Sequence, residues 1–385
     1  MHTKGKIIVS GIAFWYPLAG VAWQFLHYLL GLRKLGYDVY YIEDSARDLY
    51  DPVSNDFTSD PKVNIEVVAP FLESHGFKDN WCFRSHAQNR CFGLNESQLN
   101  QLYREADAFL NVTGAQEISD EHLKIPQRIY IETDPVVSQI KVSEGDPPTI
   151  AHLSAHDTHF TYGENIGQAD CLLPSGGFQW LPARQPVYLQ LWQHDFPPGD
   201  FYTTISTWKN KGRDVIYKGE PYYWSKDLEF EKLVKLPQRT TARFELATTP
   251  EVDAALRLIE NGWRLTPSVA LSRDFGNYRH YIQNSRGEFT VAKDQNIRLK
   301  SGWFSDRSAC YLAAGRPVIT QETGFSNHLP TGRGLFGFRT MEEILAAIET
   351  IESDYERASR AASEIARGHF SAEVVLKSIL SRAGL

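Results

Sequence analysis

Short β-branched segments alternate with longer amphipathic segments from the start of the chain. Residues Lys6–Ala13 (KIIVSGIA) form an apolar run that contains a glycine near its end, which predicts a buried strand. Apolar positions then recur at helical spacing over Val21–Gly36, and the closing glycine suits a helix C-cap. A second apolar run, Tyr37–Asp44, follows directly. This order of strand, loop, helix and strand predicts the first unit of a parallel α/β sheet.

The same alternation continues through the first 165 residues or so of the chain. We predict strands at Val63–Pro70, Ala108–Ala115 and Arg128–Pro135, a helix over Glu96–Glu105, and a further strand within Asp157–Glu164. Several of these strands end in polar or turn residues, such as glycine, aspartate and threonine. Because the carboxyl ends of the strands line the ligand crevice in open α/β sheets, we expect a binding site along this edge.

A proline-rich and poorly periodic segment, Leu181–Gly199, interrupts the pattern and is typical of an interdomain connection. A second alternation follows it. The predicted strands are Phe201–Trp208, Ala242–Thr248, Gly287–Lys293 and Arg316–Gln321, and the predicted helices are Asp227–Pro237, Thr249–Gly262, Asp274–Ser285, Ser305–Gly315 and Thr340–Ile351. The predicted fold class is therefore α/β, with an N-terminal domain of residues 1–195 and a C-terminal domain of residues 201–360 facing a central cleft. We expect helices in residues 361–385 to return to the N-terminal domain.

Length and composition agree with two globular domains. The chain has 385 residues, whereas one hydrophobic core usually serves about 150–200 residues. A net charge of −7 argues against a general nucleic-acid-binding protein. The four cysteines are scattered without C-x-x-C spacing, which predicts free thiols in a reducing cytoplasm. No transmembrane segment and no signal peptide are expected.

The segment SDRSACYLAAGRPVI, Ser305–Ile319, has the strongest chemical character in the sequence. We expect Ser305 to act as the N-cap of a helix, and Asp306 to lie at the positive end of its dipole. Small residues would let this helix pack closely against its sheet. Arg307 in the first turn opposes the dipole unless an anion is nearby, so the helix N-terminus is a candidate diphosphate site. A buried structural helix would explain the remaining residues equally well.

The segment GWFSDRSACYLAAGRPVITQETGF resembles the donor-site region of glycosyltransferases with the GT-B architecture, in which two Rossmann-like domains face a cleft. The N-terminal segment GIAFWYPLAGVAWQFLHYLLGLRKLGYDVYYIEDS resembles the first unit of the same enzymes. This resemblance implies transfer of a sugar from a nucleotide-diphosphate sugar, most commonly a UDP-sugar, to a hydroxyl acceptor. It also implies no resident metal and no cofactor besides the donor. The donor would bind the C-terminal domain and the acceptor the N-terminal domain.

The resemblance assigns the donor-binding residues by position. Those expected near the diphosphate are Ser305, Asp306, Arg307 and Ser308, with Lys293, Lys209 and Lys211 as further phosphate candidates. Gln321, Glu322 and Thr323 would approach the donor sugar. Many retaining members carry a ribose-binding glutamate at the position of Cys310, so a charged ribose contact would have to come from Glu288 or Glu322 here, or be absent. An Arg307→Ala variant should bind diphosphate more weakly and keep its fold.

A base for the acceptor hydroxyl is sought among histidines and carboxylates. The segment AHLSAHDTHFTYGEN is the richest in them, and its His156 and Asp157 are the leading candidates. Asp134, at the end of a predicted strand, is the second. The histidines and acids of this segment match no familiar zinc spacing, so no metal site is expected. A polar strand edge without catalytic function remains the alternative.

The loop FWYPLAG, Phe14–Gly20, joins the first strand to its helix and would shape the acceptor pocket, with Trp15, Tyr16 and Gly20 in contact with the acceptor. The loop is not the glycine-rich dinucleotide fingerprint, and the chain lacks a nucleophile-elbow motif. The sequence leaves two other functions open. One is a sugar-nucleotide epimerase on the same fold, and the other is a non-catalytic protein that binds a sugar or nucleotide in its cleft.

Overall fold

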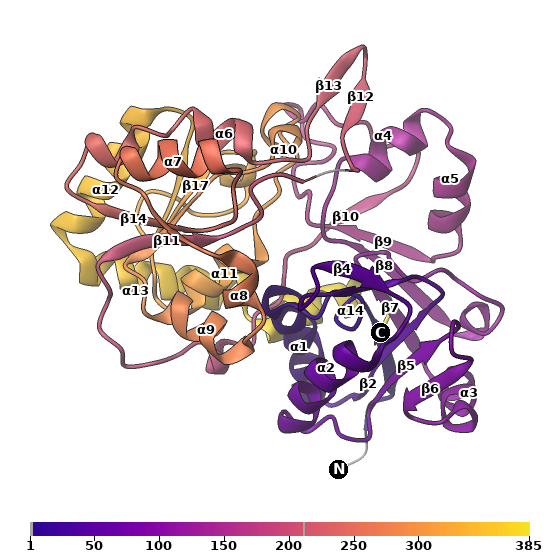
Figure 1. Cartoon of the computed structure of the whole chain (residues 1–385). Helices are drawn as coiled ribbons and strands as arrows, with labels where there is room; N and C mark the ends of the chain where they lie inside the picture. The colour runs from indigo at the N-terminus through magenta and orange to yellow at the C-terminus, as the bar shows by residue number, and fades with distance from the viewer. Residues whose placement is uncertain (1–2, 211) are drawn as a thin grey trace.

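A computed structural model describes residues 3–210 and 212–385 of the chain, which form two α/β units side by side (Figure 1). The N-terminal sheet has the strand order β10-β9-β8-β7-β1-β2-β5-β6, and its pairs are parallel except β5 with β6. Its strands are β1 (Lys6–Ser10), β2 (Asp38–Ser45), β5 (Trp81–Ser85), β6 (Arg90–Gly93), β7 (Ala108–Val112), β8 (Gln127–Glu132), β9 (Thr158–Thr161) and β10 (Trp180–Pro182). The helices of this unit are α1 (Ala19–Lys34), α2 (Lys62–Ser74), α3 (Glu96–Glu105), α4 (Val137–Ser143) and α5 (Pro147–Ser154), and β3 (Leu49–Asp51) pairs with β4 (Asp56–Thr58).

The C-terminal sheet is parallel throughout, with the order β15-β14-β11-β16-β17-β18. Its strands are β11 (Phe201–Ile205), β14 (Arg243–Ala247), β15 (Arg264–Thr266), β16 (Gly287–Thr290), β17 (Val318–Gln321) and β18 (Leu335–Phe338), and β12 (Val215–Tyr217) and β13 (Glu220–Tyr222) form a separate hairpin. The helices are α6 (Asp227–Glu231), α7 (Val252–Glu260), α8 (Ser268–Ser272), α9 (Phe275–Gln283), α10 (Asp294–Arg298), α11 (Asp306–Ala313), α12 (Met341–Ser353) and α13 (Tyr355–Ile365). The predicted fold class, two doubly wound α/β units, is confirmed.

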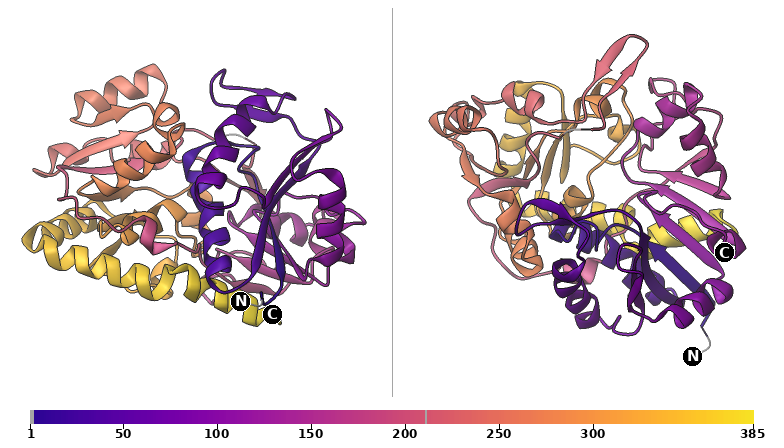
Figure 2. Two further views of the ribbon diagram at one scale, coloured as in Figure 1. Left: turned by 90° about the horizontal axis from the view of Figure 1, so that it is seen from below. Right: turned by 45° about the vertical axis from the view of Figure 1, so that its right-hand side comes forward.

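The end of the chain crosses back from the second unit to the first. After α13, a single π-helical turn at Ala366–Phe370 leads into α14 (Ala372–Arg382), which packs on α1. The left view of Figure 2 shows these yellow helices running along the bottom of both units. Contact is close at Gly31, where a Cβ atom would lie 2.5 Å from a methyl carbon of Leu376. One apolar core accordingly includes buried residues from both units, from Val9 and Leu26 to Ile205 and Leu312.

The strand predicted at Val63–Pro70 is wrong, because this segment lies within helix α2. Its local alternation of apolar and polar residues favours a strand, but tertiary contacts decide otherwise. The Asn64 side chain donates hydrogen bonds to the backbone oxygens of Phe14, at 2.7 Å, and Tyr50, at 2.9 Å. Val68 and Leu72, four residues apart, are buried on one helical face. The helix predicted over Asp227–Pro237 is shorter than expected, since α6 ends at Glu231.

None of the helices in the described part of the chain is both long and apolar enough to cross a membrane.

Candidate functional site

A cavity of about 470 Å³ lies between the two units, at the carboxyl ends of β1, β11 and β16. The N-terminal unit contributes Tyr16 and the first turns of α1, including Gly20 and Gln24. The C-terminal unit contributes the loop after β11, the segment after β16 and the start of α11. We call it the interdomain cavity. Its position matches the crevice that the strand ends predict for open α/β sheets.

Lys226 is the most unusual group on the wall of this cavity. The residue is only 5% exposed, yet its ammonium group has no hydrogen-bond or ion-pair partner within residues 3–210 and 212–385. Burial lowers the pKa of Lys226 well below its ordinary value, and the nearby cations of Arg307 and Lys293 lower it further. A buried charge is normally paired, because removing it from water is costly. An unpaired lysine facing a cavity therefore marks a site for an anionic ligand.

Lys293 is the second cation of the cavity, and it connects the two units. Its Nζ lies 2.7 Å from Asp134 Oδ2 at the end of β8, and 4.3 Å from the ring centre of Trp224. Asp134 also accepts hydrogen bonds from Trp224 Nε1 at 2.6 Å and Arg213 Nη1 at 3.3 Å. Burial by itself would raise the pKa of Asp134, but Lys293 and Arg213 hold it below its ordinary value. Asp134, predicted to be a base, is thus an ionised interdomain anchor in this arrangement.

We expect Asp134→Asn to lower the free energy of unfolding by about 1–3 kcal/mol, because an amide leaves the buried charge of Lys293 without its counter-ion. Chemical denaturation measures this change. Asp157→Asn is a matched control on the same sheet, since its ion pair with Arg128 is more exposed and should contribute less than about 1 kcal/mol. Equal losses in the two variants would contradict the role assigned to Asp134.

Arg307 lines the cavity, but its guanidinium group is engaged within the protein. Nε donates to Glu288 Oε1 at 2.6 Å, Nη1 to the backbone oxygen of Ile205 at 2.5 Å, and Nη2 to the Thr290 hydroxyl at 3.0 Å. Glu288 is fully buried. Arg307 therefore serves first to neutralise a buried carboxylate and to join β11, β16 and α11, which sequence reasoning did not foresee.

Ser305 and Asp306 stand at the start of α11. Ser305 is the N-cap residue, but the expected hydrogen bond from its hydroxyl is absent. The backbone amides of Asp306 and Arg307 act on the Asp306 carboxylate and lower its pKa. Burial raises the pKa of Asp306, although Arg307 and these amides oppose the rise. Among the described residues that line the interdomain cavity, Asp306 alone carries a carboxylate.

Four other predicted donor residues lie away from the cavity. Ser308, in the first turn of α11, is completely buried. Gln321 bonds to Glu229, its Nε2 lying 2.7 Å from the carboxylate, and Glu322 accepts the Gly324 amide at 2.7 Å, so neither reaches the cavity. The Thr323 hydroxyl donates to the backbone oxygen of Trp303 at 2.6 Å. These side chains hold the turn after β17 in place.

The loop after β11 contains the two other lysines predicted as phosphate candidates, Lys209 and Lys211. The Lys209 side chain is 54% exposed and pairs with Asp227 and Glu251 at the surface, whereas its neighbour Asn210 lines the cavity. Lys211 lies outside the described residues.

The structure corrects the proposed bases His156 and Asp157. Both precede β9, at the amino ends of the strands and thus at the sheet edge opposite the cavity. His156 bonds to Asn111 and to the backbone oxygen of His152, and burial lowers its pKa to about 3. Asp157 pairs with Arg128 at 2.7 Å. The sequence pattern reveals this cluster of histidines and acids, but it does not show at which end of the strand the cluster lies.

The predicted acceptor loop does reach the cavity. Tyr16 and Gly20 line it, and a Cβ at Gly20 would lie 3.2 Å from the Tyr278 hydroxyl. Trp15 lies behind Tyr16, with ring centres 4.9 Å apart. Cys310 is buried between α11 and α1, and neither Glu288 nor Glu322 lies among the residues that line the cavity.

The structure adds residues that the sequence did not single out, of which Lys226, Trp224 and Tyr278 are the main ones. Lys226 stands among the acids and lysines of YYWSKDLEFEKLVK, where it looks like a surface residue. No local signal distinguishes it, because its burial arises only when α6, α11 and β16 come together.

No group of three or more histidine, cysteine, aspartate and glutamate side chains suited to a metal ion occurs within residues 3–210 and 212–385.

The fold of this chain is similar to that of several solved glycosyltransferase structures. An α-glucosyltransferase in complex with UDP and a DNA 13-mer containing an HMU base is 10% identical, with a TM-score of 0.59 and complete coverage of both chains. HepE of Anabaena in complex with UDP and glucose is 11% identical, with a TM-score of 0.55 over 99% of each chain. AviGT4, a glycosyltransferase involved in avilamycin A biosynthesis, is 12% identical, with a TM-score of 0.54 over 98% of this chain and 97% of its own.

No family model and no curated protein matches the sequence. The likeness to solved structures shows the fold, which is the GT-B architecture of these glycosyltransferases.

Proposed function

We propose that the protein transfers a sugar from a UDP-sugar to the hydroxyl group of an acceptor. The observation that carries this proposal is the buried, unpaired ammonium group of Lys226 beside Lys293 on the wall of the interdomain cavity. A diphosphate supplies the negative charge that this site lacks. Solved structures with the same fold contain UDP or UDP-glucose, which supports uridine as the nucleoside.

In the proposed reaction, the bond between the anomeric carbon and the diphosphate breaks, and the departing UDP carries the electron pair. Lys226 and Lys293 would stabilise the charge that develops on the leaving oxygen. Their position in a partly enclosed cavity strengthens this interaction, because water there screens charges less. Lys293 would exchange part of its contact with Asp134 for the phosphate. The negative charge of the leaving diphosphate would then be neutralised by the protein's own lysine side chains.

Asp306 is our candidate for the group that accepts the proton of the acceptor hydroxyl. It lines the interdomain cavity opposite Gly20 and Gln24, which belong to the unit expected to hold the acceptor. Burial raises its pKa, and a carboxylate with a raised pKa is a stronger base than an exposed one. The new glycosidic bond would form as the acceptor oxygen loses its proton to this carboxylate.

Thermal unfolding with a nucleotide panel tests the proposal. UDP at 100 times its Kd should stabilise the protein by about 2.7 kcal/mol, and uridine, which lacks phosphate, should do so far less. Incubation with UDP-glucose and an acceptor should then release UDP. The absence of any melting shift with UDP at millimolar concentration would refute the donor site. An isomerised nucleotide sugar without UDP release would identify an epimerase instead.

A further inference from the structure

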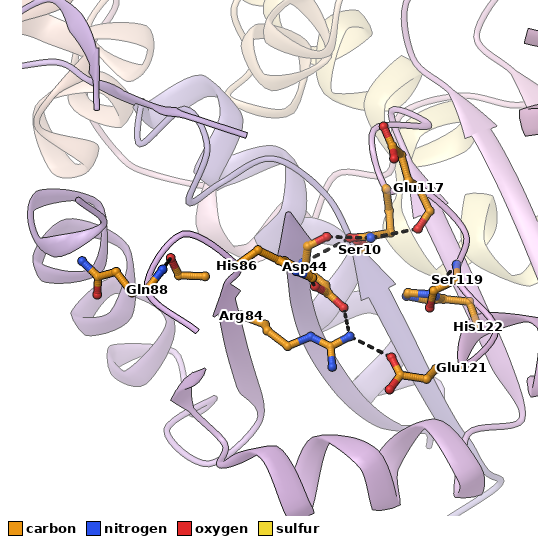
Figure 3. Close-up of polar contacts among 11 residues, drawn as sticks. Ser10, Asp44, Arg84, His86, Gln88, Glu117, Ser119, Glu121 and His122 are labelled. Carbon is orange, nitrogen blue, oxygen red and sulfur yellow. Dashed lines mark hydrogen bonds and ion pairs between the residues drawn. The ribbon is translucent and has the colours of Figure 1, made fainter. Parts of the chain in front are cut away.

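A second cavity, of about 260 Å³, opens at the carboxyl edge of the N-terminal sheet. It lies among the ends of β2 and β5 and the segment that follows β7, and we call it the strand-end cavity. Figure 3 shows its polar side chains converging from these elements. Asp44, Arg84, His86 and His122 are among the residues that line it. None of them lines the interdomain cavity, so the proposed donor site leaves them unused.

Asp44 fixes the two donors of the strand-end cavity. Its side chain is only 4% exposed and bonds to Arg84 through Oδ2 and to His86 Nε2 through Oδ1, the latter at 2.5 Å. Arg84 Nη2 also lies 2.7 Å from Glu121 Oε2 (Figure 3). Because both groups are held by their partners, the guanidinium and imidazole are oriented before any ligand arrives.

Gln116 holds the wall opposite. Its side-chain amide pairs with the backbone of Asp44, accepting from the Asp44 amide at 3.1 Å and donating to the Asp44 oxygen at 2.7 Å. Its own backbone amide donates to Asn111 Oδ1 at 3.1 Å. The segment after β7 is thereby fastened to the end of β2, and the strand-end cavity is preformed.

Hydrogen-bonding capacity remains at this site. Nε of Arg84 and Nε2 of His122 are buried without a hydrogen-bond partner, and the structure gives Nη1 of Arg84 no partner within residues 3–210 and 212–385. His122 is 1% exposed, and its Nδ1 accepts from the Ser119 amide at 3.2 Å, which leaves Nε2 as a donor. Unsatisfied buried donors are rare in proteins and indicate that a ligand or water completes them.

Charges of both signs surround the strand-end cavity, with one more carboxylate than guanidinium group. The carboxylates of Asp44, Glu117 and Glu121 face the guanidinium groups of Arg47 and Arg84, so a polyanion gains no net attraction. Uncharged groups that both donate and accept hydrogen bonds, as sugar hydroxyls do, suit such a mixture. A volume of about 260 Å³ is below the roughly 300–1,000 Å³ of pockets that enclose a whole ligand, and fits one ring of a longer molecule.

Aromatic rings connect this cavity to the interdomain cavity. The guanidinium of Arg47, on the wall of the strand-end cavity, lies 4.5 Å from the ring centre of Trp15. Trp15 in turn packs on Tyr16, whose side chain lines the interdomain cavity. Through Arg47, Trp15 and Tyr16, the walls of the two cavities are in direct contact.

We propose that the strand-end cavity binds a distal ring of a neutral oligosaccharide acceptor, whose terminal hydroxyl reacts in the interdomain cavity. This inference rests on the proposed glycosyltransferase function. Arg84, His86 and His122 would donate to sugar hydroxyls and Asp44 would hold the first two in position. Acceptor length then becomes a determinant of specificity.

The test compares acceptors of increasing length, with UDP-glucose as donor and UDP release as the readout. Methyl glucoside, cellobiose and maltose with their trisaccharides form the panel. The best trisaccharide should have a KM about tenfold or more below that of methyl glucoside, as expected for added charge-assisted hydrogen bonds. His86→Ala and Arg84→Gln should abolish this length advantage, with the Kd of UDP unchanged because the cavities are separate. Arg90→Ala, an exposed position on β6, is the matched control.

Two results would overturn the inference. One is a length advantage that survives in His86→Ala, whose half-exposed side chain can be removed without disturbing the fold. The other is an enzyme that binds UDP but neither binds nor glucosylates any neutral oligosaccharide, for example one that acts on duplex DNA. If the native protein does not bind UDP at all, the proposed function itself is refuted. The two failures are therefore distinguishable.

Discussion

A Lys226→Met variant will bind UDP at least about tenfold more weakly than the native protein and will unfold at a higher temperature. The first effect follows because the ammonium group is the unpaired cation facing the proposed diphosphate, and one hydrogen bond to a charged group contributes about 1.5–3 kcal/mol. The second follows because methionine fills similar volume without a buried charge. A gain of about 1–2 kcal/mol would raise the melting temperature by roughly 2–8 °C.

Calorimetric titration with UDP and a thermal melt of the ligand-free protein measure the two effects. Lys235→Met is the control, since Lys235 is exposed and its side chain forms no hydrogen bond or ion pair within the described residues. It should leave both quantities within about 0.5 kcal/mol of the native values. A melting temperature below that of the native protein in Lys226→Met would show that Lys226 stabilises the fold and was not retained for a ligand.

An Arg307→Ala variant will lose about 3–5 kcal/mol of unfolding free energy, the cost typical of removing one partner of a buried ion pair. The variant leaves the Glu288 carboxylate, which is fully buried, without its cation. It also removes donors from the Ile205 oxygen and the Thr290 hydroxyl. This outcome differs from the expectation drawn from the sequence, in which the fold survives and only diphosphate binding weakens.

Denaturant titration of the full-length protein measures the loss. The double variant Arg307→Met with Glu288→Leu should recover much of it, because replacing a whole buried ion pair by apolar residues is often neutral. A stable Arg307→Ala protein with weakened UDP binding would contradict this assignment and restore the sequence-based interpretation.

Local pattern was sufficient for the regular elements near the cavity. The β-branched run at Lys6–Ser10 and the helical spacing that follows it fold as expected, because their side chains meet the same apolar environment in any parallel sheet. The small residues of α11 likewise predicted a helix in close contact with its neighbours. At Val63–Pro70 the local alternation predicted a strand, but the segment is helical. The helix is favoured because it buries the Asn64 side chain and one face of apolar residues.

Local pattern predicted the α/β fold class and proposed Tyr16, Gly20, Lys293 and Asp306 for the cleft, because each lies after a strand or at a helix start. The structure places these four residues along the interdomain cavity. The partners of the charged groups, by contrast, follow from how the folded chain packs. Arg307 pairs with a buried glutamate, Asp134 pairs with a lysine from the other unit, and Lys226 forms no hydrogen bond or ion pair within the described residues. The strength of a charge depends on its distance from other charges and from water, and those distances exist only after residues far apart in the chain have packed together.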